Sequence, residues 1–336
     1  TSCNQGEVSK DASITKNMKY LSTFSGIGGF EKGIGPNHEC IGFSEIDKYA
    51  ASIYQRHFPN HKNYGDITKI VAKDLPEFEL LVGGFPCQSF SIAGKRGGFS
   101  DTRGTMFFEL ARIIREKQPR LFVFENVKGL LSHNQGRTFR TIISTLDELG
   151  YDLQWQVLNS KNHGVPQNRE RVFIIGHLRG TSRPEVFPFG DDSEATPIVS
   201  GQCSNTLTTR YYGGQANGTY VTESEQYAQE IRVKEATKQG YAVAHEGDSI
   251  NLSVPNSKTR RGRVGKGVAQ TIDTGMQQHT LQNSQIRRLA PTECERLQGF
   301  PDGWTEGVSD TQRYKTLGNA VTVNVIKDIC EKLLQS

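Results

Sequence analysis

The stretch Leu80-Leu81-Val82-Gly83-Gly84-Phe85-Pro86-Cys87-Gln88-Ser89 joins an apolar run to a polar loop through two glycines. Three aliphatic residues bounded by glycine predict a short buried strand. Pro86 restricts the backbone directly before Cys87. On this stretch alone a buried structural cysteine is an equal alternative, because Cys is among the most buried residue types. The polar surroundings instead favour a thiol at the carboxyl end of a strand, where open α/β sheets bind their ligands.

Outward from this stretch, short apolar runs alternate with helical patterns between Lys19 and Leu178. Apolar residues recur at helical spacing from Phe107 to Ile114 and from Ile142 to Leu149. This alternation predicts an α/β fold with a doubly wound, mostly parallel sheet. The strands are expected at residues 19–24, 40–43, 80–82, 121–124, 155–158 and 171–175.

The pattern changes near residue 180. Residues 181–285 are rich in Gly, Thr, Ser and Asn and predict a smaller, irregular, β-rich second domain. Regular patterning returns at Ile286, and a last helix is expected from Val321 to Leu334. We therefore expect three parts, namely an N-terminal tail at 1–17, a first domain made of 18–180 and 286–336, and a second domain at 181–285.

Composition narrows the class of protein. The chain has 336 residues and a net charge of +4, which permits a polyanionic partner without requiring one. Its six cysteines include no C-x-x-C pair, so neither a zinc site nor a disulfide framework is expected, and we predict no metal. The N-terminus lacks a signal-peptide core, and no run approaches the roughly 18 apolar residues of a membrane span. These features predict a cytoplasmic protein without a membrane partner.

Three features at strand ends point to a cofactor. Ser25-Gly26-Ile27-Gly28-Gly29 is a glycine loop without G-x-G-x-x-G spacing or a Walker lysine, which disfavours a pyrophosphate or triphosphate. Glu45 lies 19 residues after Gly26, at a position from which a carboxylate binds ribose hydroxyls. Asp66 fits either a contact to an adenine amino group or a helix N-cap. Together they predict a cofactor that contains adenosine.

Catalytic candidates follow other strand ends. Cys87 requires activation, because a free thiol titrates near ~8.5. Glu125 comes directly after an apolar run, so burial is expected to raise its pKa and let it donate a proton, unless it is a solvent-facing loop acid. Arg169 and Arg171 share one direction on an extended segment and suit an anionic backbone or a carboxylate. A surface ion pair, for example with Glu170, is the alternative for these arginines.

With these residues, the chain resembles the cytosine-C5 DNA methyltransferases, particularly the compact bacterial and phage enzymes. The likeness covers residues 20–175 and 287–329 and rests on motifs in the expected order. These are Phe24 to Phe30, Pro86-Cys87-Gln88, Asp101 to Gly104, Glu125-Asn126-Val127, Gln167 to Arg171, Arg288 to Cys294, Arg296 to Pro301 and Gly318 to Val321.

The resemblance implies S-adenosylmethionine as the cofactor, with S-adenosylhomocysteine as product. It implies that Cys87 is the nucleophile and Glu125 the catalytic acid. Arg171 then orients the base or Glu125, while Arg169 steadies a phosphate or the thiolate loop. The implied cofactor contacts are Phe24, Gly26, Ile27, Gly28, Gly29, Glu45, Ile46, Asp66, Ile67, Pro86, Asn319 and Val321.

The same resemblance makes residues 181–285 the target-recognition domain, acting on cytosines turned out of double-stranded DNA. The family threonine of this domain is either Thr206, favoured by its neighbour Leu207, or Thr271, favoured by its place in the chain, and we take Thr271. Expected nucleic-acid contacts are Gln88, Ser89, Ser91, Arg260, Arg263 and Thr271.

The implied role is protection of DNA in a restriction-modification system or a phage, by a monomer whose functional partner is a cognate endonuclease. The nearest alternative is the same chemistry on a transfer-RNA cytosine. More distant alternatives are a DNA-binding regulator without catalysis and a nucleotide-dependent oxidoreductase.

Overall fold

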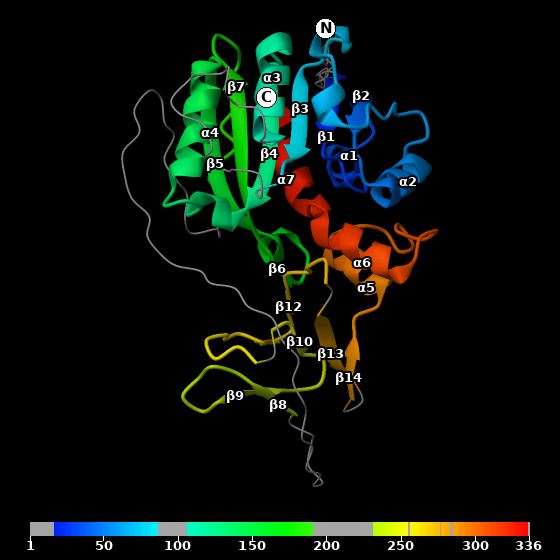
Figure 1. Ribbon diagram of the computed structural model, residues 1–336, viewed down its shortest axis with the longest axis vertical. Helices are drawn as coiled ribbons and strands as arrows, with labels where there is room; N and C mark the ends of the chain where they lie inside the picture. Colours follow the sequence, from blue (N-terminus) through cyan, green and yellow to red (C-terminus); the bar gives the residue numbers. More distant parts are fainter. Residues whose placement is uncertain are drawn as a thin grey trace, which may run out of the picture.

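The computed structural model describes residues 17–86, 106–190, 231–254, 256–275, 277–282 and 285–334. Several predictions lie outside these residues: the tail at 1–16, the motif at 101–104, and the residues Cys87, Gln88, Ser89, Ser91, Thr206 and Leu207. The described chain forms a large domain around one mixed sheet and a small domain of short strands beneath it (Figure 1).

The large domain is built on a six-stranded sheet. Its strands are β1 (Lys19–Thr23), β2 (Glu39–Ser44), β3 (Leu80–Gly84), β4 (Leu121–Val127), β5 (Tyr151–Asn159) and β7 (Glu170–Leu178). They lie in the order β2-β1-β3-β4-β7-β5, and the pairs among β2, β1, β3 and β4 are parallel. The predicted α/β class and mostly parallel sheet are confirmed.

The end of the sheet formed by β4, β7 and β5 is antiparallel. Only residues 160–169 connect β5 to β7. A parallel crossover needs a dozen or more residues and usually a helix, so this connection allows only the antiparallel pairing. Apolar pattern alone does not show strand direction, and the sequence therefore did not predict the reversal.

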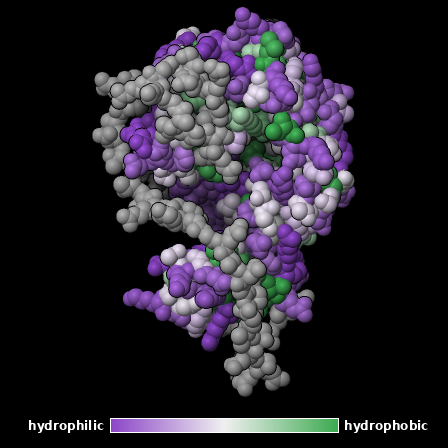
Figure 2. Space-filling view, viewed as in Figure 1, coloured by the Kyte–Doolittle hydropathy of each residue, from purple (hydrophilic) through white to green (hydrophobic). Residues whose placement is uncertain are grey.

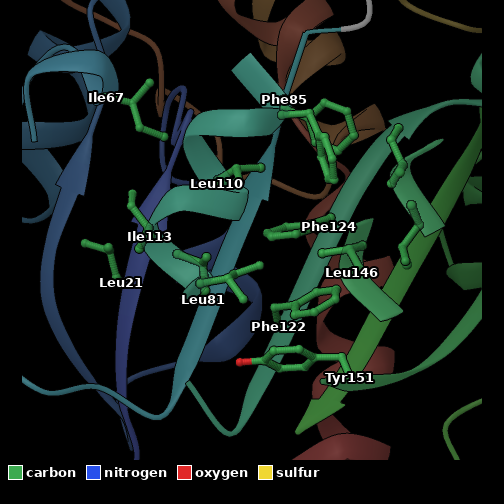
Figure 3. Close-up of a cluster of buried hydrophobic side chains, with 14 of the residues drawn as sticks. Leu21, Ile67, Leu81, Phe85, Leu110, Ile113, Phe122, Phe124, Leu146 and Tyr151 are labelled. Atoms are coloured by element: carbon green, nitrogen blue, oxygen red, sulfur yellow. The ribbon is translucent and has the colours of Figure 1, made fainter. Parts of the chain in front are cut away.

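Apolar residues on both faces of the sheet explain why its strands read as continuous hydrophobic runs. On β4, Phe122 and Phe124 face one core, while Leu121 and Val123 face the other. Figure 3 shows the first of these cores, where Phe122 and Phe124 lie beside Leu146 and Tyr151.

Helices cover both faces. The first face is covered by α3 (Met106–Lys117) and α4 (Arg137–Glu148), which match the two helices predicted from apolar spacing. The second face is covered by α1 (Gly29–Ile34) and α7 (Val323–Leu334), so the last helix packs on the first domain as predicted. The helix α2 (Lys48–His57) packs with α5 (Pro291–Leu297) and α6 (Asp310–Asn319) in a third core.

The small domain is made of short strands, as expected. They are β8 (Ile231–Lys234), β9 (Tyr241–Ala244), β10 (Ser249–Asn251), β11 (Val264–Gly265), β12 (Ala269–Gln270), β13 (Gln278–Gln282) and β14 (Gln285–Arg288). Four form an antiparallel sheet in the order β11-β10-β13-β14, and β8 pairs with β9. The strand β12 instead pairs with β6 (Gln167–Asn168) of the large domain, which places a two-strand ladder at the junction (Figure 1).

The domain borders differ from the predicted residues 180 and 286. Val186 and Phe187 lie in a core of the large domain, and their backbone N–H groups donate to Gln154 Oε1. The strand β14 pairs with β13, so the chain leaves the small domain only after Arg288. A buried glutamine side chain that receives backbone donors gives no signal in a hydropathy pattern, which explains the first difference.

Among the helices of the described residues, none has the length and apolar character needed to cross a membrane.

Candidate functional site

An ion pair between Glu125 and Arg171 lies at the carboxyl end of β4. Arg171 Nε is 2.9 Å from Glu125 Oε1, and the two side chains are only 15% and 13% exposed. Glu125 lies opposite Phe173 on β7, and Arg171 is two residues from Phe173 on the same face. The pair is therefore a diagonal cross-strand neighbour pair, set by the register of β4 and β7.

The strand that leads to Cys87 ends beside this pair. Gly84, the last residue of β3, lies opposite Glu125, and a Cβ on Gly84 would be 3.0 Å from Glu125 Oε2. Asn126 Nδ2 donates to the Phe85 carbonyl, 2.8 Å away. The two adjacent residues of β4 thus contact both residues that precede Pro86. This arrangement brings the carboxylate to the start of the predicted nucleophile loop, whose Cys87 lies outside the described residues.

The sequence predicted that Arg171 orients either the base or Glu125. The ion pair is the contact that the second of these roles requires.

The glycine loop after β1 is held by Glu45. Glu45 Oε2 accepts from the Gly26 N–H at 2.9 Å, and Oε1 accepts from the Asp47 N–H at 2.8 Å. Burial raises the pKa of Glu45 above its ordinary value. Phe24 and Gly26 both have positive φ, 50° and 56°, and this conformation is uncommon for a phenylalanine. The sequence spacing between Gly26 and Glu45 therefore corresponds to a direct contact.

Next to Glu45, Ile46 is 76% exposed, which makes it the most exposed of the large apolar side chains in the described part of the chain. Asp66 caps a short helical turn, because its Oδ1 accepts from the Thr68 N–H and hydroxyl, and these hydrogen bonds lower its pKa. The N-cap alternative for Asp66 is thus present, and it involves one carboxylate oxygen. Ile67 packs in the core, so a ligand would meet only its backbone.

The C-terminal motif returns to the glycine loop. A Cβ on Gly29 would lie 2.7 Å from Val321 Cγ1, so the loop and Val321 are in close contact. Asn319 is exposed at the end of α6. Trp304 Nε1 donates to the Ile27 carbonyl at 2.9 Å and supports the loop from below. The expectation that residues 319–321 come back to the first strand end agrees with this geometry.

These residues fit an adenosyl sulfonium better than a nucleotide phosphate. The loop offers a carboxylate at Glu45 for a ribose diol, the exposed Ile46 for a flat ring, and Phe24 at the strand end. None of these side chains is basic, so none offers a phosphate a cationic partner. The side chains therefore agree with S-adenosylmethionine. In the described part of the chain, no three His, Cys, Asp or Glu side chains gather as a metal site would require.

Arg169 was predicted to steady a phosphate or the thiolate loop, but its contacts in the structure are different. It is 2% exposed and donates only to backbone carbonyls among its assigned hydrogen bonds, those of Ile272, Gly318 and Ala320. Burial lowers its pKa to about 9. The predicted shared direction with Arg171 fails because β6 ends at Asn168 and β7 begins at Glu170, so Arg169 lies between two strands.

The small domain carries a basic run in its sequence, and the members of this run differ in their contacts; they are Lys258, Arg260, Arg261, Arg263 and Lys266. Arg263 is 2% exposed and donates to the carbonyls of Asn251, Ser253 and Val254, so the prediction that it contacts DNA is wrong. Its charged group replaces missing backbone donors at the end of β10. Lys258 and Arg261 are exposed and Arg260 is half-buried. Hydrophilic side chains cover much of the face of this domain seen in Figure 2.

Thr271 is half-buried at the junction of the domains, and its hydroxyl donates to the Asn168 carbonyl at 2.8 Å.

Three residues that the sequence did not single out contribute to the site. Asn126, Trp304 and Gln167 donate side-chain N–H groups to the carbonyls of Phe85, Ile27 and Leu297 respectively. Each of these residues lies inside a motif or just after one. An amide or indole side chain at such a position was the sequence feature that could have indicated a hydrogen bond to the site's backbone.

A buried carboxyl lies beneath the loop on α1. Glu31 is 2% exposed, and its Oε1 accepts from the Tyr54 hydroxyl at 2.9 Å. Tyr54 also hydrogen-bonds His61 Nδ1 at 3.0 Å. Burial raises the pKa of Glu31 from its ordinary 4.5 to about 7.

Comparison with known proteins identifies the class. Residues 18–335 match the family described as C-5 cytosine-specific DNA methylase. The Type II methyltransferase M1.ScrFI of Lactococcus lactis subsp. cremoris is 38% identical over 324 residues, which are 96% of this chain and 79% of the relative. M.HhaI of Haemophilus parahaemolyticus is 33% identical over 95% of both chains. The orphan methyltransferase M.SPRI of Bacillus phage SPR is 32% identical over 95% of this chain and 98% of its own.

Solved structures agree on the fold. A DNMT2 of Spodoptera frugiperda superposes with a TM-score of 0.60 at 18% identity, covering 95% of this chain and all of the other. A methyltransferase encoded within an E. coli prophage gives 0.58 at 19%, covering 95% and 99%.

The family match thus defines an S-adenosylmethionine-dependent methyltransferase, with a fold that agrees. The chain belongs to the C-5 cytosine-specific DNA methylase family and is a DNA (cytosine-5-)-methyltransferase.

We predict that Glu31 makes stability fall with rising pH. A folded-state pKa near 7 above an unfolded value near 4.5 gives stabilisation that is complete below pH 4.5 and lost as the pH rises through about 7. Glu31→Gln keeps a partner for Tyr54 without the charge. Relative to wild type, it should gain about 2–3 kcal/mol of unfolding free energy between pH 5 and pH 8.

Urea unfolding of both proteins at the two pH values measures this difference. The other titratable groups are the same in both proteins, so their contributions cancel. A difference that does not change with pH would show that Glu31 is not buried as a neutral acid.

Proposed function

We propose that the chain methylates carbon 5 of a cytosine extruded from double-stranded DNA, with Cys87 as the nucleophile and Glu125 and Arg171 at the pyrimidine. The observation that supports this best is the Glu125 carboxylate, paired with Arg171 and lying against Gly84, three residues before Cys87.

The reaction requires a covalent step because carbon 5 of cytosine is a weak nucleophile. Addition of the Cys87 thiolate to carbon 6 breaks the carbon 5–carbon 6 double bond and leaves an enamine that is nucleophilic at carbon 5. When bound, S-adenosylmethionine supplies a methyl group on a sulfonium, which is an electrophile. A base then removes the proton from carbon 5, and the electron pair restores the double bond as the thiolate leaves.

Glu125 acts at the pyrimidine N3. Thiolate addition places negative charge on the ring, and a proton or a strong hydrogen bond at N3 relieves it. Arg171 fixes the carboxyl group from the neighbouring strand through the 2.9 Å contact. Asn126 fixes the start of the nucleophile loop through Phe85. Of these two neighbours on β4, one thereby supplies the acid and the other holds the backbone that leads into the nucleophile loop.

The cofactor site is proposed at the ends of β1 and β2. Glu45 would accept hydrogen bonds from the ribose hydroxyls, and the exposed Ile46 would cover the adenine. Asp66 retains Oδ2 for the adenine amino group while Oδ1 caps the turn. Contacts from Phe24, Pro86, Asn319, Val321 and the loop glycines are also proposed.

A base inside a stacked duplex cannot reach this edge, so the cytosine has to be flipped out at a cost of a few kcal/mol. We propose that Gln88, Ser89, Ser91 and Thr271 contact the opened DNA and that the small domain reads the sequence. The exposed Lys258 and Arg261 and the half-buried Arg260 would neutralise phosphates.

The biological role proposed is modification of one short DNA site by a monomer in the bacterial cytoplasm. Relatives named Type II methyltransferases support a restriction-modification role, with a cognate endonuclease as functional partner. The relative named as an orphan phage methyltransferase supports self-protection without one.

Transfer of labelled methyl groups to duplex DNA and to transfer RNA, assayed side by side, tests this function. Incorporation into carbon 5 of cytosine in DNA alone is expected. Incorporation into transfer RNA alone would overturn the choice of substrate.

We predict that Glu125→Gln lowers kcat for methyl transfer by about 10²–10⁴-fold, because a neutral amide cannot donate the N3 proton. Binding of S-adenosylhomocysteine should stay within about twofold. The matched control is Glu170→Gln, since Glu170 also lies on this edge but pairs with Lys128 and is 46% exposed. Equal loss of kcat in both variants would contradict the role of Glu125.

We predict that changing Lys258, Arg260 and Arg261 to Ala flattens the salt dependence of DNA binding. Each lost phosphate contact should reduce the slope of log K against log salt by about 0.9. The control changes Lys19, Lys73 and Lys327 of the large domain, which pair with glutamates, and alters net charge equally. Identical slopes for both triple variants would show that the basic run does not touch phosphate.

A further inference from the structure

Arg169 connects two segments that the proposed function assigns to different ligands. Its Nη1 donates to the Ile272 carbonyl at 3.0 Å. Its Nη2 donates to the carbonyls of Gly318 at 3.0 Å and Ala320 at 2.8 Å. These last two residues flank Asn319, the proposed cofactor contact. Ile272 instead follows Thr271, the proposed DNA contact. One buried guanidinium thus holds both segments.

The neighbours of Arg169 in sequence hold the DNA-side segment as well. Gln167 Oε1 accepts from the Ile272 N–H at 3.0 Å, and the Asn168 carbonyl accepts from the Thr271 hydroxyl at 2.8 Å. Gln167 is itself fully buried and also donates to Leu297 O at 2.7 Å. Three consecutive residues of the large domain therefore bind two consecutive residues of the segment that enters the small domain.

The two segments also touch each other directly. A Cβ on Gly318 would lie 2.6 Å from the Asp273 carbonyl carbon and 2.7 Å from the Thr274 nitrogen. Only glycine permits this approach, because real Cβ atoms do not come so close to backbone. Residues 271–274 and the turn at Asn319 are thus in backbone contact, and Arg169 lies across the contact.

The geometry of the guanidinium makes this link stiff. Its donors lie in one plane at fixed angles, so the three carbonyls have to keep a fixed relation to keep their hydrogen bonds. The group is fully buried, and each broken hydrogen bond would leave a buried polar group without its partner, which is unfavourable. A shift of residues 271–273 would therefore displace the turn at Asn319.

We propose that Arg169 is a positioning residue that couples binding of target DNA to binding of the cofactor, by fixing residues 271–273 and the Asn319 turn in one arrangement. The proposal rests on the function proposed above and adds a regulation to it. Coupling between two binding sites is reciprocal, so DNA should tighten cofactor binding by the factor by which cofactor tightens DNA binding.

The test measures the Kd of S-adenosylhomocysteine by calorimetry, alone and with a saturating duplex. The duplex carries the site found by bisulfite sequencing of plasmid from expressing cells. Wild type should bind at least about fivefold more tightly with DNA, the lower end of common coupling. Arg169→Lys keeps the charge but loses the planar fork. For this variant, the ratio of the Kd without DNA to the Kd with DNA should fall below about twofold.

Arg263→Lys is the matched control. Arg263 is equally buried and also donates to three carbonyls, but all three belong to the small domain. It should cost stability as Arg169→Lys does while leaving the ratio at the wild-type value. A normal ratio in Arg169→Lys, or an equal loss in Arg263→Lys, would overturn the proposal.

Two further measurements test the proposal even if the Arg169 variant does not fold. Gly318→Ala acts by sterics at the same contact and should also lower the ratio. In wild type without DNA, S-adenosylhomocysteine should slow hydrogen exchange of the amides at 269–274, and unchanged exchange would contradict the link. Wild type that methylates no DNA would overturn the proposed function instead, so the two failures are distinguishable.

Discussion

The ion pair between Glu125 and Arg171 depends on the antiparallel pairing of β4 with β7, and the candidate active site depends on the ion pair. In the observed register, Glu125 and Arg171 are diagonal neighbours on one face of the sheet, and Gly84 lies beside Glu125 on β3. A shift of β7 by one residue against β4 would send the Arg171 side chain to the face opposite Glu125. The ion pair therefore requires that the sheet be mixed here, since a parallel β7 would place Arg171, near its start, at the opposite edge of the sheet.

The same sheet edge gathers the rest of the site. The loop after β1 and Glu45 at the end of β2 lie on one side of β3, and Glu125 lies on the other. The chain end returns to this edge through the contact of Val321 with Gly29. A methyl donor held at β1 and β2 would thus face a pyrimidine held at β4 across the end of β3.

Much of this was predictable from the sequence, for physical reasons. Strands that are buried on both faces are continuous apolar runs, so the sequence predicts a strand at each of the six places, and strand ends carry the polar residues that bind ligands. The predictions that failed depend on contacts that a hydropathy or charge pattern does not show. Alternation placed Arg169 and Arg171 on one face, but a break between β6 and β7 turns Arg169 inward. Arg263 was predicted to contact DNA, yet its guanidinium donates to three backbone carbonyls, and no sequence pattern reveals these contacts.

The most direct test of the central claim uses duplex DNA with 5-fluorocytosine at the target position, together with S-adenosylmethionine. Fluorine cannot leave carbon 5 as a proton does, so the covalent complex persists through denaturing electrophoresis, and peptide mass spectrometry locates it. The predicted result is an adduct on the peptide that contains Cys87, absent in Cys87→Ser. Active enzyme that yields no adduct, or an adduct at another residue, would contradict the account.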